Sequence, residues 1–434
     1  MNQNLSFRDQ KYIWHPYTQH KNMVFPVPVE RAERTILFGA DGRQYIDAVS
    51  SWWVTVHGHG HPYIAKKIYE QALKLEQVIF TGFTHEPAVR LAERLLPMLP
   101  GNFSKLFYSD NGSTATEVAI KMALQFWWNL LGQPEKTTER NRILAFKDAY
   151  HGDTFGAMSV SGRSIFTRPF RDQLFDVEVI DLPDASNINQ LTAFLRENGK
   201  KIAGFIFEPL VQGAGGMRMY QAEYMNWLLQ VCREEKIICI ADEVMTGFGR
   251  TGTMFACEQL DVKPDIICLS KGITGGVMAL GATACSEEIY EAFLHDDKLR
   301  TFFHGHSFTA NPMACAASLA SLDLFEEEKT LESISRIQKR NTAFAQQLKQ
   351  LEDTALTISN IRVQGTILAF DVEVDDVRGY LNHLGAVITA AAMKEGVYLR
   401  PLGNTVYILP PYCITDEELD KVFQTILKIV VEGV

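Results

Sequence analysis

One lysine of this chain stands where an apolar run meets a glycine-rich turn. Lys271 lies in the stretch PDIICLSKGITGG, directly after an apolar run that predicts a buried strand. An amine in this place can form a Schiff base with an aldehyde cofactor, and once released it can move protons. To be neutral near pH 7, its pKa must fall by about 3 units, which a pocket with little water and a nearby cation supplies. The alternative is a strand-end lysine that simply reaches solvent.

An aspartate occupies a similar place 29 positions earlier in the chain. Asp242 follows the apolar run of IICIADEVMTGFGRTG. A carboxylate there can pair with the ring nitrogen of pyridoxal phosphate and keep that ring protonated, so that it accepts electrons from a carbanion. A turn or N-cap aspartate is the alternative. The combination of two strand ends, one with Asp242 and one with Lys271, indicates pyridoxal phosphate more specifically than either residue alone.

A third stretch is suited to binding an anion. In DNGSTATE, Gly112 and Ser113 enter a predicted helix. The free N–H groups and the dipole at a helix N-terminus favour a phosphate. An ordinary Ser/Thr N-cap is the alternative, and beside Lys271 and Asp242 we prefer phosphate binding.

These residues need a scaffold that brings strand ends together. Short apolar runs alternate with helical patterns from about residue 100 to about residue 310. Continuous runs of Val, Ile, Leu and Phe between helices are typical of a mostly parallel sheet covered on both faces. Ligands of such α/β sheets gather at the C-terminal ends of the strands, where Lys271 is predicted to lie. The predicted strands include residues 142–146, 177–182, 202–210, 237–243 and 265–270.

The pattern changes after about residue 312, where two long helices precede strands of a smaller α+β unit. The first 50 residues carry short strand signals, and we expect them to join that unit. The last helix is predicted to begin with a capping box, because Thr415 is followed three positions later by Glu418. The expected division is a first segment of the small domain (1–50), a large domain (51–311), and linking helices with the rest of the small domain (312–434).

Composition excludes several classes of function. The net charge is −10 and the basic residues are scattered, which argues against a nucleic-acid partner. The seven cysteines form no CxxC pair and several lie in apolar runs, as expected for a reduced, cytoplasmic protein. No signal peptide and no apolar run of about 18 residues is found, so we expect no membrane association.

The chain resembles the fold-type I enzymes that use pyridoxal phosphate and, among them, the class III aminotransferases. The resemblance rests on ADEVMTGFGRTG, PDIICLSKGITGG, FEPLVQGAGG and YSDNGSTATEVAIKMA, and it extends over nearly the whole chain. It implies a mostly parallel central sheet with helices on both faces, plus a smaller α+β domain made by the N- and C-terminal segments. It also implies that Lys271 holds the cofactor covalently and that Asp242 pairs with its ring nitrogen.

The resemblance extends to the groups around the cofactor ring. DAYHGDTFGAMSVSG matches the segment whose aromatic residue covers the ring, so Tyr150 is expected to stack there, among the catalytic residues, with His151 close by. A plain core tyrosine is the alternative. Glu208, in FEPLVQG, is expected to contact the cofactor site from behind Asp242.

Enzymes of this kind complete the phosphate site with a Ser or Thr from a second subunit. HGHSFTANP offers Ser307 at the matching position, and Thr309 is a nearby competitor. Gly305, in the same stretch, is expected at the substrate. The resemblance therefore implies a homodimer with shared active sites.

Three other stretches, WHPYTQH, SSWWVTVHGHGHP and GVYLRPLGNTVYILPPY, resemble the biotin-pathway branch of the family. That branch transfers an amino group to 8-amino-7-oxononanoate. S-adenosylmethionine is the implied donor, although some relatives use lysine. The acceptor, 8-amino-7-oxononanoate, has a methylene chain, which suits aromatic faces, and a carboxylate, which suits an arginine. The residues expected to bind substrate are Tyr17, Trp52, Trp53, Arg400 and Tyr407. Tyr407 is expected to hydrogen-bond near Arg400. For Trp53, a role in the core alone is the alternative.

Other functions compete with this reading. An ω-amino-acid or ornithine-type aminotransferase would share the core, and a mutase that uses the same cofactor would need no separate acceptor. A regulator with an aminotransferase-like body would need a DNA-binding segment, which we do not find. GGVMALG lacks the spacing of a dinucleotide loop. The alternating His57, His59 and His61 hint at a metal, but the intervening glycines favour turn roles, and we assign no metal.

Overall fold

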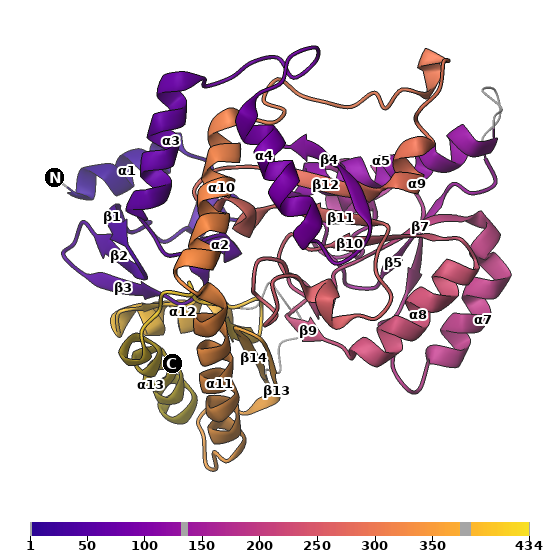
Figure 1. The fold of residues 1–434 in the computed structure, drawn as a ribbon. Helices are drawn as coiled ribbons and strands as arrows, with labels where there is room; N and C mark the ends of the chain where they lie inside the picture. The colour runs from indigo at the N-terminus through magenta and orange to yellow at the C-terminus, as the bar shows by residue number, and fades with distance from the viewer. Residues whose placement is uncertain (1, 132–137, 374–382, 434) are drawn as a thin grey trace.

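The protein is described here by a computed structural model that covers residues 2–131, 138–373 and 383–433 (Figure 1). Its centre is a sheet of seven strands in the order β4-β12-β11-β10-β7-β5-β6. β12 runs antiparallel to both of its neighbours, and the pairings from β11 to β6 are parallel. The predicted mostly parallel α/β sheet is confirmed. The strands are β4 (Phe103–Ser109), β5 (Arg142–Phe146), β6 (Val177–Ile180), β7 (Ile202–Phe207), β10 (Ile238–Asp242), β11 (Ile266–Leu269) and β12 (Gly281–Ser286).

The central strands are apolar throughout because helices cover both faces of the sheet. Along β10, Ile238 and Ile240 pack in the cluster that contains helix α5 (Gly112–Leu131). The alternate residues Cys239 and Ala241 pack in the cluster of the opposite face, with helices α7 (Ile188–Asn198) and α8 (Ala222–Glu234). Successive side chains of a strand point to opposite faces of the sheet. Because both faces are covered, both sets of alternate side chains must be apolar.

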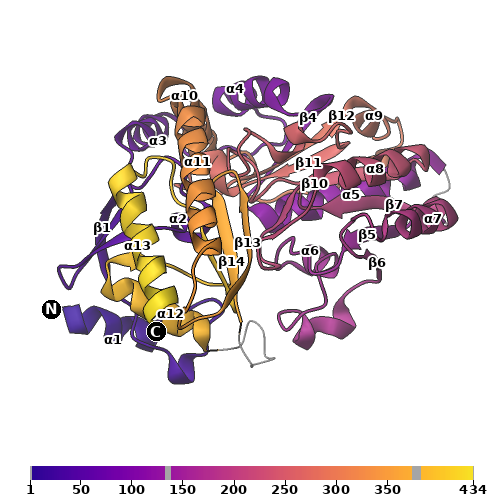
Figure 2. The same cartoon turned by 90° about the horizontal axis from the view of Figure 1, so that it is seen from below.

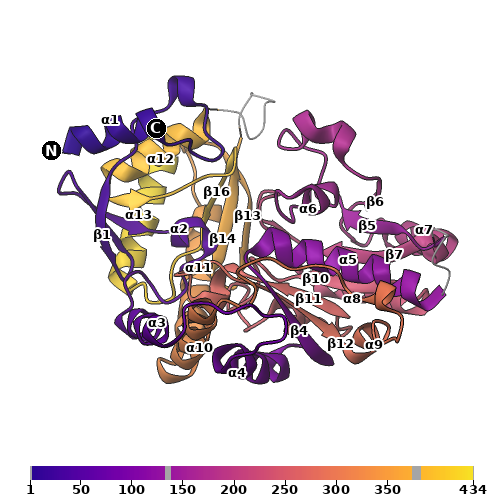
Figure 3. The same ribbon diagram turned by 90° about the horizontal axis from the view of Figure 1, so that it is seen from above.

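Of two further sheets, one joins strands from both ends of the chain and the other comes from its C-terminal part. β3 pairs in parallel with β15, which places an N-terminal strand beside a C-terminal one. Figures 2 and 3 show both chain ends on the same side of the molecule. This arrangement supports the proposed small domain, whose boundaries stay a proposal. The strands are β1 (Val29–Glu33), β2 (Ile36–Gly39), β3 (Gln44–Asp47) and β15 (Val397–Tyr398) in one sheet, and β13 (Ile358–Gln364), β14 (Ile367–Val372) and β16 (Thr405–Ile408) in the other.

Long helices connect the two parts. Helix α10 (Pro312–Glu327) packs on α3 (Pro62–Lys74), α4 (Glu86–Leu95) and the 3₁₀ turn η6 (Lys271–Thr274), while α11 (Thr330–Lys349) packs on β13 and β14 (Figure 1). The remaining longer helices are α1 (Asn2–Tyr12), α12 (Leu384–Lys394) and α13 (Asp416–Glu432).

Helix α13 begins as predicted. The Thr415 hydroxyl accepts a hydrogen bond from the backbone N–H of Glu418, and the Glu418 carboxylate accepts one from the backbone N–H of Thr415. The capping box is therefore confirmed. Within the described ranges, no helix is both long and apolar enough to cross a membrane.

Candidate active site

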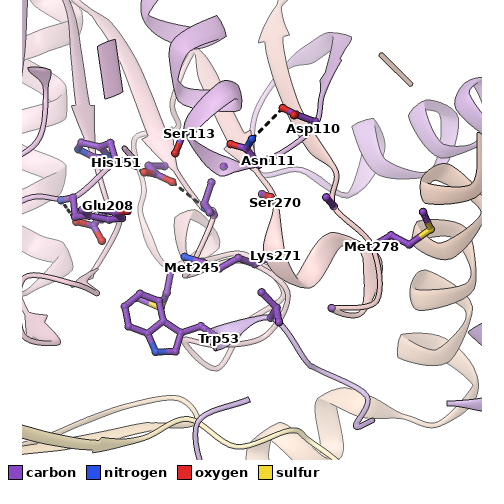
Figure 4. A pocket seen from close by; sticks show the side chains of 18 of the residues that line it. Trp53, Asp110, Asn111, Ser113, His151, Glu208, Met245, Ser270, Lys271 and Met278 are labelled. Atoms are coloured by element: carbon purple, nitrogen blue, oxygen red, sulfur yellow. Dashed lines mark hydrogen bonds and ion pairs between the residues drawn. The ribbon is translucent and has the colours of Figure 1, made fainter. Parts of the chain in front are cut away.

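A cavity of about 510 Å³ lies where β10 and β11 end and α5 begins. It brings together Lys271, Asp242 and Ser113, which come from three separate stretches of the sequence. In Figure 4 the Lys271 side chain lies above Trp53, with Ser113 and Asn111 across the cavity. Other predicted residues on its wall are Gly112, Tyr150, Glu208 and Trp53, whereas Tyr17, Trp52, Gly305, Ser307, Arg400 and Tyr407 are not on it.

The amine of Lys271 enters this cavity from a strained turn. The residue has a left-handed backbone (φ 46°) directly after β11. The hydroxyl of Ser270 donates to the carbonyl of Leu280 at 2.7 Å and holds the turn. Nζ of Lys271 lies 4.8 Å from the ring centre of Trp53. Burial lowers the pKa of Lys271 to about 8, although the charges of Asp242 and Glu208 oppose the shift. The amine is therefore easier to deprotonate than a surface lysine.

Asp242 is held by a histidine. Its Oδ2 lies 2.7 Å from Nδ1 of His151, and its Oδ1 accepts a hydrogen bond from the backbone N–H of Val244 at 3.0 Å. Both side chains are buried. The backbone of His151 is fixed in turn, because its N–H donates to the hydroxyl of Ser161 and its carbonyl accepts from Thr116. The pair presents a carboxylate of fixed orientation to the cavity.

Glu208 braces the loops around the cavity. One carboxylate oxygen accepts a hydrogen bond from the backbone N–H of Tyr150 at 3.1 Å, and the other accepts one from Gly213 at 2.8 Å. Burial raises the pKa of Glu208 to about 7, a shift that His151 opposes and Asp242 reinforces. Glu208 thus lies close enough to Asp242 to feel its charge, and its hydrogen bonds go to the backbone.

The start of α5 forms a narrow cradle. Asn111 caps it, since its side-chain oxygen accepts from the backbone N–H of Thr114 at 3.0 Å. A Cβ at Gly112 would lie 2.7 Å from a methyl group of Val244, so only glycine fits there without a shift. A Cβ at Gly152 would lie 2.1 Å from the hydroxyl oxygen of Ser113. The N–H groups of this first turn can hold an anion. Asn111 was missed from the sequence, although a cap residue before a helix is a recognisable signal.

An aromatic wall adjoins the cavity at Tyr150, which lines the cavity and also belongs to the wall. The hydroxyls of Tyr17 and Tyr150 are 3.2 Å apart, and the Tyr17 hydroxyl also donates to the carboxylate of Asp153. The rings of Tyr17 and Trp52 meet edge to face at 5.5 Å. The guanidinium carbon of Arg400 lies 4.1 Å from the ring centre of Trp52. We name Tyr17, Trp52, Tyr150, Asp153 and Arg400 the entry wall.

Trp53 and Tyr407 form a buried pair beside that wall. The indole N–H of Trp53 donates to the Tyr407 hydroxyl at 2.9 Å, and Tyr407 is 1% exposed. The contact places Tyr407 beside Trp53, in a strand that is buried throughout, and the expected hydrogen bond of Tyr407 near Arg400 stays a prediction.

The stretch before α10 lies apart from the cavity of its own chain. Gly305 and Ser307 are exposed, and the carbonyl of Ser307 accepts from the side chain of Gln77. The hydroxyl of Thr309 is bound within its own loop, because it donates to the carbonyl of His306 and accepts from the N–H of the same residue.

The three alternating histidines bind separate partners. His57 lies 3.0 Å from the hydroxyl of Ser321, His59 lies 2.9 Å from Asp47, and His61 lies 3.2 Å from Glu328. Burial lowers the pKa of His57 to about 3. These contacts give each ring a role in packing or turn structure.

Arg250 is a buried arginine that sequence reasoning did not single out. Its guanidinium donates to the carbonyls of Trp53, Thr55 and Pro410 at 3.1–3.3 Å. An arginine inside GFGRTG, shortly after a buried strand, was an available signal. Its role depends on carbonyls far away in the sequence, which the motif does not reveal.

Comparison with known proteins assigns this architecture to a family. The family model described as aminotransferase class-III matches residues 17–430. The chain is 46% identical to the adenosylmethionine-8-amino-7-oxononanoate aminotransferase of Synechococcus elongatus, over 96% of this chain and 97% of that protein. It is 40% identical to the protein of the same name from Geobacter sulfurreducens, over 96% and 95% of the two chains.

Solved structures agree with the sequence comparison. The enzyme of that name from Methanocaldococcus jannaschii superposes with a TM-score of 0.91 and 34% identity over 99% of both chains. An ω-transaminase from Pseudomonas jessenii in complex with PMP gives a TM-score of 0.89 and 26% identity, over 98% of this chain and 96% of that one. The chain belongs to the class III aminotransferases.

Proposed function

We propose that this protein is the aminotransferase of biotin biosynthesis that transfers the amino group of S-adenosylmethionine to 8-amino-7-oxononanoate, giving 7,8-diaminononanoate by a ping-pong mechanism. The observation that carries the proposal is one cavity in which an amine of lowered pKa faces a buried carboxylate–histidine pair and a helix N-terminus. The names of full-length relatives at up to 46% identity supply the substrates.

The residues of the cavity fit pyridoxal phosphate. Lys271 supplies the amine for its aldehyde, Asp242 supplies a carboxylate for its ring nitrogen, and the start of α5 at Gly112 and Ser113 supplies N–H groups for its phosphate. The glycine at 112 leaves room for the close approach of an anion to the backbone. When bound, the cofactor supplies an aldehyde that captures amines and a ring that accepts electrons.

The chain's own residues then handle protons and orientation. Nζ of Lys271 removes a proton from the amine-bearing carbon of the donor and later returns one, and its lowered pKa favours this exchange near neutral pH. Asp242 holds a proton on the ring nitrogen, and His151 fixes the carboxylate that does so. Glu208 holds the backbone of Tyr150, whose ring would cover the cofactor.

The entry wall suits an acceptor with a methylene chain and a terminal carboxylate. Tyr17, Trp52 and Tyr150 offer aromatic faces, and Arg400 offers a planar pair of N–H donors to a carboxylate. A cation–π contact with the ring of Trp52, at 4.1 Å, helps to hold the guanidinium in place. We assign Trp53 and Tyr407 to the support of this wall. We assign Gly305 of one subunit to the substrate site of the neighbouring subunit.

We further propose a cytoplasmic homodimer. The hydroxyl of Ser307 in one subunit would complete the phosphate site of the other, and the engagement of the Thr309 hydroxyl within its own loop favours Ser307. A cytoplasmic site accords with seven free cysteines, six of them buried.

An ω-transaminase is the second candidate, favoured by the structural likeness to the Pseudomonas jessenii enzyme. A half-reaction screen separates the two. The cofactor-loaded protein is mixed in turn with S-adenosylmethionine, lysine, ornithine or 4-aminobutyrate, and the cofactor's absorbance is followed. We expect S-adenosylmethionine to convert it and 8-amino-7-oxononanoate to restore it. Conversion by 4-aminobutyrate or ornithine, with no restoration by 8-amino-7-oxononanoate, would contradict the proposal. Lys271→Ala is the control that responds to no donor.

A further inference from the structure

The turn that carries the two tryptophans has an unfavourable backbone. Ser50 (φ 52°), Ser51 (φ 59°) and Trp53 (φ 67°) all lie in the left-handed region, and none is glycine. Such conformations persist only where the surroundings hold them. The turn directs the two neighbouring rings differently, since Trp52 is 38% exposed and Trp53 is 4% exposed.

One side of the turn is held by Asp47, the last residue of β3. Its Oδ1 accepts a hydrogen bond from the backbone N–H of Val49 at 3.1 Å, and its Oδ2 accepts one from Ser51 at 2.7 Å. Oδ2 also lies 2.9 Å from Nε2 of His59. The side chain of Asp47 is fully buried, so its charge depends on these donors rather than on water.

The opposite side of the turn is held by Arg250, which donates to the carbonyls of Trp53 and Thr55. The turn is also anchored by its own Ser50, whose hydroxyl donates to the carbonyl of Leu409. Burial lowers the pKa of Arg250, while Tyr412 and the nearby charge of Asp47 act in the opposite direction. The turn therefore lies between a buried carboxylate that binds its N–H groups and a buried guanidinium that binds its carbonyls.

We infer that Asp47 is a positioning residue for the acceptor site: it holds the turn of residues 49–53 so that Trp52 meets Tyr17 and Arg400 while Trp53 packs beside the amine of Lys271. The assignment of the acceptor to the entry wall rests on the proposed function; the constraint on the turn does not. Loss of the carboxylate releases two N–H groups at once, and the left-handed residues then relax.

The test compares Asp47→Ala and Asp47→Asn with a matched control, Asp41→Asn. Asp41 also accepts the backbone N–H of the residue two positions later, Arg43, but lies in an exposed turn away from the cavity. Two quantities are measured on the cofactor-loaded protein: hydrogen exchange of a peptide spanning residues 48–56, and the KM and kcat for 8-amino-7-oxononanoate.

For Asp47→Ala we expect exchange of the 48–56 peptide to accelerate at least about tenfold and the acceptor KM to rise about tenfold, with a smaller change in kcat. Asp47→Asn keeps one acceptor oxygen, so its exchange rate and its KM should lie between those of Asp47→Ala and the unaltered protein. If the alanine variant does not fold, the test uses Asp47→Asn alone. Asp41→Asn changes neither quantity. Unchanged exchange at 48–56, or exchange accelerated equally in all peptides, overturns the inference. If the unaltered protein does not use 8-amino-7-oxononanoate, the proposed function fails, and exchange still decides whether Asp47 holds the turn.

Discussion

The cavity around Lys271 and the entry wall differ in the elements that build them and in how deeply they are buried. Lys271, Asp242 and Ser113 lie at or shortly after the ends of β11, β10 and β4, three strands of one sheet, and the Asp242–His151 pair is buried. The entry wall joins Tyr17, Trp52 and Arg400, which come from distant parts of the chain and are exposed or partly exposed. Under the proposed function, the sheet would fix the residues of the chemistry, while segments from outside it would contact the acceptor.

Loss of the lysine amine should have the largest effect on activity. This effect should come from the cavity alone, because Lys271 is not part of the entry wall. We expect Lys271→Ala to slow the donor half-reaction by about 10⁴-fold or more, because it removes both the covalent attachment and the proton carrier. Stopped-flow absorbance measures the rate, and circular dichroism checks that the fold is kept. Residual turnover within tenfold of the unaltered protein would refute the role of Lys271.

Asp242→Asn should come next. The amide keeps the shape and one hydrogen-bond acceptor but loses the charge that holds a proton on the ring, so we expect kcat to fall about 10²–10³-fold. The melting temperature should move by only a few degrees, because His151 still has an acceptor. A large loss of stability with intact kcat would reassign Asp242 to a structural role.

Arg400 tests the other region. We expect Arg400→Ala to raise the KM for 8-amino-7-oxononanoate about 10–100-fold and to leave the donor half-reaction much less affected. Arg400→Lys keeps the charge and loses the paired donors. Its KM should therefore lie between that of the unaltered protein and that of Arg400→Ala. Equal losses in both half-reactions would show that the two regions are not separable in this way.

The pH dependence of Lys271 sharpens the description of the cavity. In the cofactor-free protein its amine, with a pKa of about 8, becomes neutral as the pH rises through 8, well below the ordinary lysine value of about 10.4. Residue-resolved reductive methylation between pH 6 and pH 11 should therefore give Lys271 a midpoint near 8, ahead of surface lysines. A midpoint above 10 would mean that the cavity does not desolvate the amine.

The smallest effect is expected behind the entry wall. Tyr407→Phe removes the acceptor for the indole N–H of Trp53 and should cost about 1 kcal/mol in the free energy of unfolding. Urea denaturation measures this cost. The acceptor KM should change less than it does for Arg400→Ala, and an equal change would place Tyr407 at the substrate.

Local patterns were sufficient for the sheet and for the residues that follow its strands. Asp242 and Lys271 were recognised because an apolar run directly precedes each of them. The hydrogen bond between Trp53 and Tyr407 joins residues more than 350 positions apart, so local patterns could not indicate it, and the expected placement of Tyr407 near Arg400 stays a prediction. Asp47 and Arg250 act through backbone groups of the turn between them, and single-sequence patterns carry no record of such contacts.

The pairing of β3 with β15 has a consequence for the order in which the protein can form during synthesis. Ile46 lies opposite Val397, so this sheet cannot close until the ribosome has added about 350 further residues. Contacts this distant in sequence are slow to form. The nascent chain can therefore complete the seven-stranded sheet, whose last strand ends at Ser286, before β15 and the neighbouring Arg400 have been synthesised.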